Sequence, residues 1–213
     1  MADSPAFGTA LQKKSLRATE QDRPDVAQAR ADWRCAQSEV DPQRLVFVDE
    51  TGLKTDMSRF RGWAEKGMRL VDTSPGGHWH TSSLVHAIAL DGTRAAMVLD
   101  GPLNSLCFAG FCERFLAPNL RRGDLVVLDN LSSHKSSIAS GAVEAVGAKL
   151  IYLPPYSPDL NPIENMFSKI KQLIRGLRPA TWRQIIQATK QALLSITYED
   201  IENAFFHCGY EAT

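Results

Sequence analysis

The chain has 213 residues, 44% of them apolar, and its 24 lysines and arginines balance its 24 aspartates and glutamates. This length and apolar content suit one well-cored domain with a short appendage. The zero net charge excludes a globally basic nucleic-acid binder, so any site for a polyanion must be local.

Signals for targeting, membrane insertion and cross-linking are lacking in the sequence. No segment approaches the ~20 apolar residues that cross a bilayer, and the polar N-terminus lacks the apolar run of a signal peptide. The four cysteines show neither CxxC spacing nor a histidine partner at zinc-finger distance. We therefore expect a cytoplasmic protein with reduced thiols and no membrane partner.

Three regions are expected along the chain. Residues 1–23 are polar and predict a mobile arm, whereas residues 24–43 predict a linker helix. The apolar side chains of that helix recur at three- and four-residue spacing, at Val26, Ala29, Trp33 and Ala36. A catalytic-type domain is expected over residues 44–213, beginning with a strand at Leu45–Val48 that is apolar on both pleat faces.

The middle of the chain predicts a mixture of loops, strands and helices. A loop with a short strand is expected between Thr51 and Gly77, and a hairpin is expected around the turn dipeptide Asp91-Gly92. A helix is expected at Asn104–Leu116, with three candidate core contacts: Leu106, Phe111 and Phe115. A strand at 124–130, a helix at Ser136–Val146 and a strand at 149–153 follow.

The C-terminal third predicts three helices, at Pro162–Leu177, Thr181–Ile196 and Tyr198–His207, with Thr181 as an N-cap. Together the elements predict an α/β fold in which a mixed sheet carries helices on its faces. The later strands of that sheet run parallel through right-handed crossovers.

Two aspartates follow matching strands. "LVFVDE" and "LVVLDN" are each four apolar residues followed by an aspartate, Asp49 and Asp129. If the strands are parallel neighbours, both carboxylates leave the same sheet edge about 5 Å apart, where open α/β sheets bind ligands. Such a pair calls for a hard cation such as Mg²⁺, although a strand-ending aspartate is also a common turn or cap residue.

Glu164 stands at the start of the helix that follows a proline-rich loop. Asn161 at the N-cap, Pro162 at N1 and Glu164 at N3 resemble a capping box, in which the glutamate only reaches back to the N–H of Asn161. At 100° per residue, however, Glu164 borders the apolar stripe on the flank that also carries Lys171 and Arg175. The glutamate would then face the aspartates, and the two cations are either phosphate ligands or solvated helix charges.

Three segments carry a resemblance to a known family: "VFVDET", "VVLDNLSSHKS" and "LPPYSPDLNPIENMFSKIK". They resemble the signature blocks of DDE transposases of the mariner-related bacterial insertion-sequence family. Asp129 and Glu164 are separated by 34 residues, a spacing typical of that superfamily. The resemblance implies a ribonuclease-H-like, integrase-like fold with a mixed five-stranded sheet, flanking helices and extra C-terminal helices.

The resemblance also implies an activity and its cofactors. The family's catalytic, metal-binding triad falls on Asp49, Asp129 and Glu164, with two Mg²⁺ ions, or Mn²⁺ as a substitute, serving phosphodiester hydrolysis and strand transfer at transposon ends. It implies double-stranded DNA as partner, with a TA-containing target, a DNA-bound homodimer, and a bacterial, nucleoid-associated location. Members of the family also carry a helix-turn-helix region, for which residues 1–40 are too short and too polar. Three explanations stay open: a separately encoded helix-turn-helix part, a decayed fragment, or an excised catalytic domain.

Further positions match the family with less defined roles. Glu50 should point to the opposite pleat face from Asp49, so a local hydrogen bond is expected for it rather than the same metal. Asn130, His134 and Lys135 are candidate DNA or phosphate contacts, although such a junction is also what ordinary helix capping produces. The segment from Arg59 to Arg69 either contacts DNA or is a solvated hairpin with Trp63 packed on the core, and we favour the second.

Three functions remain open from the sequence. The first is a DDE transposase catalytic domain, and the second is a metal-dependent nuclease on the same fold that cleaves without strand transfer. The third is a non-catalytic, transposase-derived fragment that binds DNA or oligomerises. The intact triad argues against the third function.

Overall fold

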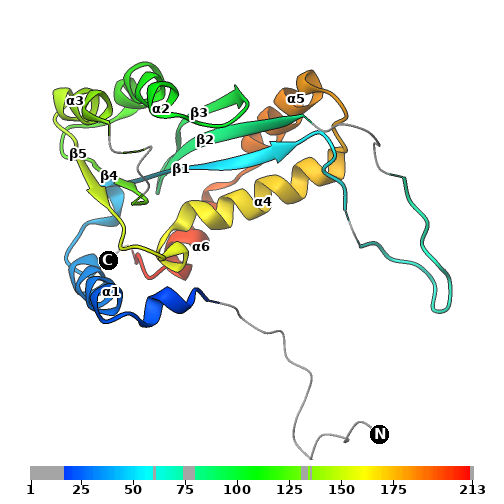
Figure 1. The fold of residues 1–213 in the computed structure, drawn as a ribbon, viewed down its shortest axis with the longest axis horizontal. Coiled ribbons are helices and arrows are strands. Elements are labelled where there is room, and N and C mark those ends of the chain that lie inside the picture. The colour runs from blue at the N-terminus through cyan, green and yellow to red at the C-terminus, as the bar shows by residue number, and fades with distance from the viewer. Residues whose placement is uncertain (1–16, 60, 74–79, 131–133, 135, 212–213) are drawn as a thin grey trace, which may run out of the picture.

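The computed structural model describes residues 17–59, 61–73, 80–130, 134 and 136–211. A five-stranded sheet forms its centre, and helices cover both faces (Figure 1). The strands are β1 Leu45–Lys54, β2 Thr81–Ala89, β3 Gly92–Asp100, β4 Leu125–Leu128 and β5 Lys149–Tyr152. The principal helices are α1 Pro24–Gln37, α2 Ser105–Phe111, α3 Ser137–Ala145, α4 Pro162–Leu177, α5 Trp182–Leu194 and α6 Tyr198–His207.

The sheet order is β3-β2-β1-β4-β5. The first three strands form an antiparallel meander, whereas β4 pairs with β1 and β5 pairs with β4 in parallel. Two hairpin-like connections and two helical crossovers explain this mixture, because only parallel neighbours need a long connection. The expected mixed sheet with parallel later strands is confirmed.

The strand β1 is buried on both faces and divides the core. Leu45, Phe47 and Leu53 contribute to the cluster beneath α4, α5 and α6, and Val46 and Val48 to the cluster beneath α2 and α3. This alternation is the period-two geometry of a strand. Odd-numbered side chains of β1 therefore face the layer of α4, α5 and α6, and even-numbered ones face the layer of α2 and α3.

Helix α4 has the bounds that the sequence predicts. Its buried side chains are Ile163, Met166, Phe167, Ile170 and Ile174, which form the expected stripe, while Leu177 at its end is 46% exposed. The helix ends where Arg178 adopts a left-handed conformation with φ of 50°, directly before Pro179. The next helix, α5, begins with the expected N-cap Thr181, which forms a capping box with Gln184.

Helix α1 ends at Gln37, six residues before the expected end of the linker at 43. Its apolar stripe is incomplete, because Val26 is buried and Ala36 is exposed, while Arg30 is buried among polar partners. The helix is tied to the C-terminal end of the chain by Trp33, which donates to the hydroxyl of Tyr210 at 3.0 Å. Of the expected arm, residues 1–16 lie outside the described residues, and Thr19–Asp22 form a 3₁₀ turn.

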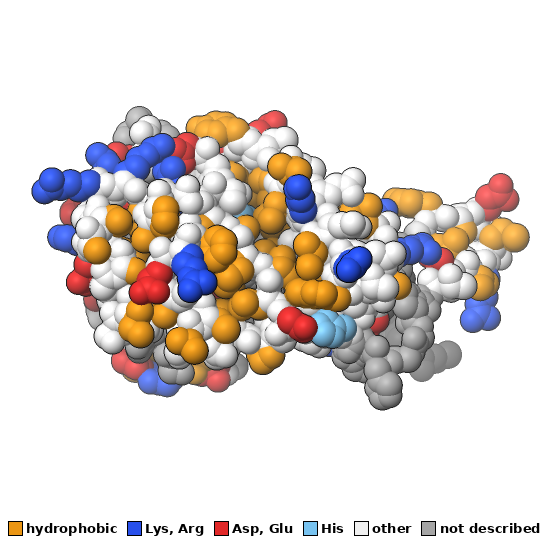
Figure 2. Space-filling view, turned by 90° about the horizontal axis from the view of Figure 1, so that it is seen from above, with side chains coloured by type: hydrophobic (Ala, Val, Ile, Leu, Met, Phe, Trp, Pro, Cys, Tyr) orange, Lys and Arg blue, Asp and Glu red, His pale blue; other side chains and the backbone are white. Residues whose placement is uncertain are grey.

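Two burial predictions are wrong. Trp63 is fully exposed on the segment that leaves the sheet between β1 and β2 and extends from the body (Figure 1). In the helix at 105–116, which continues from α2 as a π-helical turn Cys112–Leu116, Phe111 is buried but Leu106 and Phe115 are exposed. Apolar side chains accordingly lie at the surface over the face that α2 and α3 cover (Figure 2).

No helix in the described ranges is both long and apolar enough to cross a membrane.

Candidate active site

The aspartates at 49 and 129 occupy equivalent positions on neighbouring parallel strands. Leu45 pairs with Leu125, and the register continues to Phe47 and Val127. Each aspartate lies two residues beyond that last pair, where the parallel pairing of the two strands stops. Asp129 follows the end of β4, whereas β1 continues past Asp49 to Lys54 along β2. The expected juxtaposition of the two aspartates is confirmed, but the expectation that the first strand ends at Val48 is wrong.

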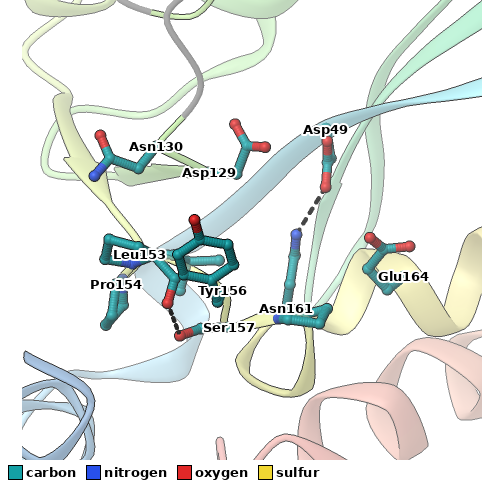
Figure 3. Close-up of a pocket in the computed structure, with 11 residues that line it drawn as sticks. Asp49, Asp129, Asn130, Leu153, Pro154, Tyr156, Ser157, Asn161 and Glu164 are labelled. Carbon is teal, nitrogen blue, oxygen red and sulfur yellow. Dashed lines mark hydrogen bonds between the residues drawn. The ribbon is translucent and has the colours of Figure 1, made fainter. Parts of the chain in front are cut away.

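A cavity of about 380 Å³ opens where this parallel pairing stops, and it collects the acidic side chains of all three sequence segments. Asp49 comes from β1, Asp129 from the loop after β4, and Glu164 from the first turn of α4 (Figure 3). In this view Asp49 lies between the other two carboxylates. The remaining wall consists of Asn130, Asn161 and the proline-rich loop from Leu153 to Pro158.

Asn161 joins the start of α4 to the middle of β1. Its Nδ2 donates to Oδ2 of Asp49 at 2.9 Å (Figure 3), and no side chain caps α4. The alternative interpretation of Glu164 as only a capping-box residue is therefore wrong. Asn161 holds the N-cap position, yet its amide restrains a carboxylate on the sheet instead of satisfying the helix terminus.

The electrostatic environment of Asp49 is strongly unfavourable to a charge. The side chain is only 7% exposed. Burial, the neighbouring Asp129 carboxylate and Glu164 raise the pKa of Asp49, the backbone N–H of Glu50 lowers it, and the net pKa is about 7. A buried carboxylate near two others lacks counter-charge, which a bound cation would supply.

Glu164 faces the same shortage of positive charge, with one cation nearby. Partial burial raises its pKa, Lys171 lowers it, and Asp129 raises it again. Lys171 lies on the same flank of α4 with Arg175, and burial together with Arg175 lowers the pKa of Lys171 while Glu164 raises it. The predicted cationic flank of α4 therefore exists beside the glutamate.

On the opposite pleat face, Glu50 and His134 form a chain to Asp129. His134 is fully buried, its Nδ1 lies 2.5 Å from Asp129 Oδ1, and its Nε2 lies 2.8 Å from Glu50 Oε2. Its ring also packs on Phe108 of α2, with centroids 4.6 Å apart. Burial lowers the pKa of His134, but the bonds to Asp129 and Glu50 outweigh it and raise the pKa to about 9. Both ring nitrogens then donate at neutral pH.

The hydrogen bonds between Glu50, His134 and Asp129 correct two expectations. Glu50 does point away from Asp49, but its partner is His134, which is 84 residues distant, rather than a local group. His134 has both ring nitrogens engaged and no exposed surface, so it is not placed to contact DNA. Its position restrains Asp129 instead.

The other candidate DNA contacts are distributed around the cavity. Asn130 is exposed and lines the cavity. Lys135 lies outside the described residues. Lys171 and Arg175 extend along α4 from Glu164.

The donor set of the cavity fits a hard divalent cation. Carboxylate and amide oxygens are the ligands that Mg²⁺ prefers, and the buried Oδ1 of Asn161 finds no hydrogen-bond partner among the described residues. Over those same residues, no three acidic, histidine or cysteine side chains already stand close enough to hold one ion. Gathering the carboxylates on a single ion therefore requires side-chain movement.

A family model described as "DDE superfamily endonuclease" matches residues 44–186, about two-thirds of the chain. The chain belongs to this family. The three acidic residues of the cavity all lie within the range that the family model matches. No curated protein sequence matches the chain.

Solved structures agree with the family assignment at the level of the fold. The Mos1 transposase paired-end complex with the left transposon end matches with a TM-score of 0.78 at 14% identity over 95% of the chain, and the Mos1 mariner paired-end complex with Mn matches with a TM-score of 0.79 at 14% identity over 95%. The catalytic domain of Mos1 mariner transposase matches with a TM-score of 0.63 at 12% identity, covering 93% of this chain and 92% of that one. The chain thus has the ribonuclease-H-like fold, and it spans 64% of the length of the chains in the two paired-end complexes.

Sequence reasoning missed the two residues that restrain the aspartates. Asn161 was interpreted as a helix cap, and Glu50 and His134 were not connected with each other. A local signal existed only for Glu50, whose parity along β1 places it opposite Asp49. The partners of Asn161 and Glu50 lie 112 and 84 residues away, so no sequence spacing indicates them.

Proposed function

We propose that this chain is the catalytic domain of a DNA transposase that hydrolyses phosphodiester bonds at transposon ends and transfers the freed strand to target DNA. The observation that supports this proposal is the convergence of Asp49, Asp129 and Glu164 on one cavity where the parallel pairing of β1 and β4 stops. These residues would hold divalent cations, Mg²⁺ or Mn²⁺ and two per site. Some of the similar Mos1 structures were determined with Mg or Mn.

When bound, such ions activate the attacking oxygen and stabilise the leaving oxygen of an in-line displacement. The chain's own residues prepare the site. Asn161 holds one oxygen of Asp49, and His134 with Glu50 holds one oxygen of Asp129, so that one oxygen of each aspartate is restrained before an ion binds. Lys171 and Arg175 would meet DNA phosphates beside Glu164.

The decisive experiment is a strand-transfer assay with pre-cleaved duplexes that carry the element's own terminal repeat, a plasmid target, and Mg²⁺ or Mn²⁺. Wild-type protein should join the strands, and Glu164→Gln should abolish joining because it removes a charged ligand while it keeps the size of the side chain. Ser168→Ala, on the same exposed flank of α4, is the matched control and should keep full activity. Joining that is unchanged in Glu164→Gln would refute the assignment of the triad.

A metal-dependent nuclease that cleaves without joining is the second candidate, because the matching family is described as an endonuclease. The same assay separates the two functions by product. Cleaved ends without joined strands would favour the nuclease.

The remaining features of the proposal follow from the resemblance to mariner-related elements. They are a bacterial insertion-sequence origin with a nucleoid-associated location, a TA-containing target, a homodimer on DNA, and a separately encoded helix-turn-helix part. Sequencing of the joined products gives the target, and sizing of the protein–DNA complex gives its stoichiometry.

A further inference from the structure

We infer that Tyr156 is a stacking platform for an unpaired nucleobase of the DNA strand whose phosphate enters the acidic cavity. This inference rests on the proposed function and extends it to a residue that positions the substrate. Tyr156 lies in the proline-rich loop between β5 and α4 and lines the cavity with the three acidic residues.

The backbone of Tyr156 adopts a conformation that costs free energy. Its φ is 55°, in the left-handed region that favours glycine and asparagine and is unusual for a bulky side chain. Such strain persists only where the surrounding structure enforces it, and it concentrates at functional sites. A reason is therefore needed for a tyrosine at this position.

The fold enforces this conformation with several hydrogen bonds. The Tyr156 carbonyl accepts from Gln21 Nε2 at 2.6 Å and from Arg30 Nη1 at 3.4 Å. Arg30, 8% exposed, also donates to Ser157 Oγ at 2.8 Å and binds both carboxylate oxygens of Asp159 at 2.7 and 2.9 Å. Helix α1 therefore holds the loop rigidly at the cavity.

The ring does not contribute to the core in return. Tyr156 is 47% exposed, and its hydroxyl makes no hydrogen bond to the described part of the chain. Figure 3 shows the ring extending from the loop toward Asp129 and Asn130 at the cavity wall. A half-exposed aromatic ring that is held rigidly beside a cavity is suited to contact a ligand.

The charge of the two cavities beside Tyr156 indicates which ligand fits. Tyr156 lines the acidic cavity and also a cleft beside α1. In that cleft three arginines, Arg17, Arg30 and Arg34, pair with two aspartates, Asp22 and Asp159, which leaves one positive charge in excess. A strand whose reacting phosphate lies in the cavity would run its next phosphates along this cleft, and the base between them would meet the ring. Only an unpaired base presents its flat face, so the platform requires a strand end or an unpaired site.

Photo-crosslinking tests this inference with the full chain and a forked duplex that carries 5-iodouracil at successive unpaired positions. We expect one position to crosslink to Tyr156, as mapped by mass spectrometry. A crosslink that maps only to other residues would overturn the inference, and this result needs no variant.

Two substitutions separate the ring from the backbone strain. Tyr156→Phe keeps the ring, so crosslinking and affinity for the forked duplex should be retained. Tyr156→Asn removes the ring but suits the left-handed backbone, so the melting temperature should be unchanged or higher while affinity falls by about 5- to 100-fold. Equal affinity of Tyr156→Asn and wild type, or equal loss in both variants, would overturn the inference.

Separate experiments test the proposed function and the stacking role of Tyr156. Nicking of supercoiled plasmid by the wild-type protein in Mn²⁺ tests the activity, whereas the crosslink tests the platform. An inactive protein that crosslinks at Tyr156 contradicts only the proposed function. An active protein without the crosslink contradicts only the platform.

Discussion

Replacement of Asp49 by asparagine should stabilise the metal-free protein above neutral pH. The pKa of Asp49 rises from an ordinary 3.8 to about 7 because the side chain is buried beside Asp129 and Glu164. The folded state therefore binds a proton more tightly than the unfolded state does. The carboxyl disfavours folding progressively as the pH rises from about 4 through 7.

The size of the effect follows from the same pKa values. A rise from 3.8 to about 7 corresponds to at most about 4 kcal/mol in the free energy of unfolding once Asp49 is fully ionised. For a chain of this length, each kcal/mol shifts the melting temperature by about 2–4 °C. Asp49 accepts from Asn161 Nδ2 and from the Glu50 N–H through its two oxygens, and an asparagine can accept only one of these bonds, so the loss of the other reduces the gain by about 1 kcal/mol.

The assay is thermal unfolding in EDTA between pH 4 and pH 8.5. The melting temperature of Asp49→Asn should equal that of wild type near pH 4 and exceed it at pH 8. Saturating Mg²⁺ should raise the melting temperature of wild type only. Glu202→Gln removes one charge from an exposed position of α6 and is the control. Equal melting temperatures of Asp49→Asn and wild type at pH 8, or a gain of the same size at pH 4, would refute the reasoning.

Three further predictions concern the residues around the site and the exposed segment. Glu50→Gln and His134→Ala should each lower the free energy of unfolding by about 2–4 kcal/mol. The double variant should lower it by less than the sum, because either substitution breaks the same hydrogen-bonded series from Glu50 through His134 to Asp129. Additive losses in urea unfolding would contradict this coupling. Asn161→Ala should lower the free energy of unfolding by about 1 kcal/mol in wild type at pH 8 and by less in the Asp49→Asn background, as a double-mutant cycle would measure. Trp63→Ala should change stability by less than about 0.5 kcal/mol because the side chain is fully exposed, and a loss of several kcal/mol on denaturation would show that it packs in solution.

Much of the secondary structure could be predicted because its signals are local. The sequence Asn161-Pro162 starts α4, and the apolar spacing that begins at Ile163 carries the helix to Leu177, as observed. The burial of single apolar side chains was less predictable. Trp63 and Leu106 are exposed because burial depends on what packs against each segment, which periodicity does not specify.

The candidate site was predictable to the extent that it depends on the ends of elements. Asp49 and Asp129 follow matching apolar segments, and parallel pairing of these segments brings the two aspartates to equivalent positions. Glu164 follows a defined helix start. The sequence left two roles open for Glu164, and the structure places it at the cavity and shows no side-chain cap on α4.

The sequence by itself indicated most of the strands and helices, because capping and apolar periodicity act over a few residues, and its three signature segments pointed to Asp49, Asp129 and Glu164, whereas the continuation of β1 to Lys54 was not predicted. Only the tertiary structure decided that Asn161 restrains Asp49, that His134 links Asp129 to Glu50, and that Arg30 holds Tyr156 in a left-handed conformation. These contacts join segments that are distant along the chain. Their geometry arises when the sheet and the helices pack, and no local pattern encodes it.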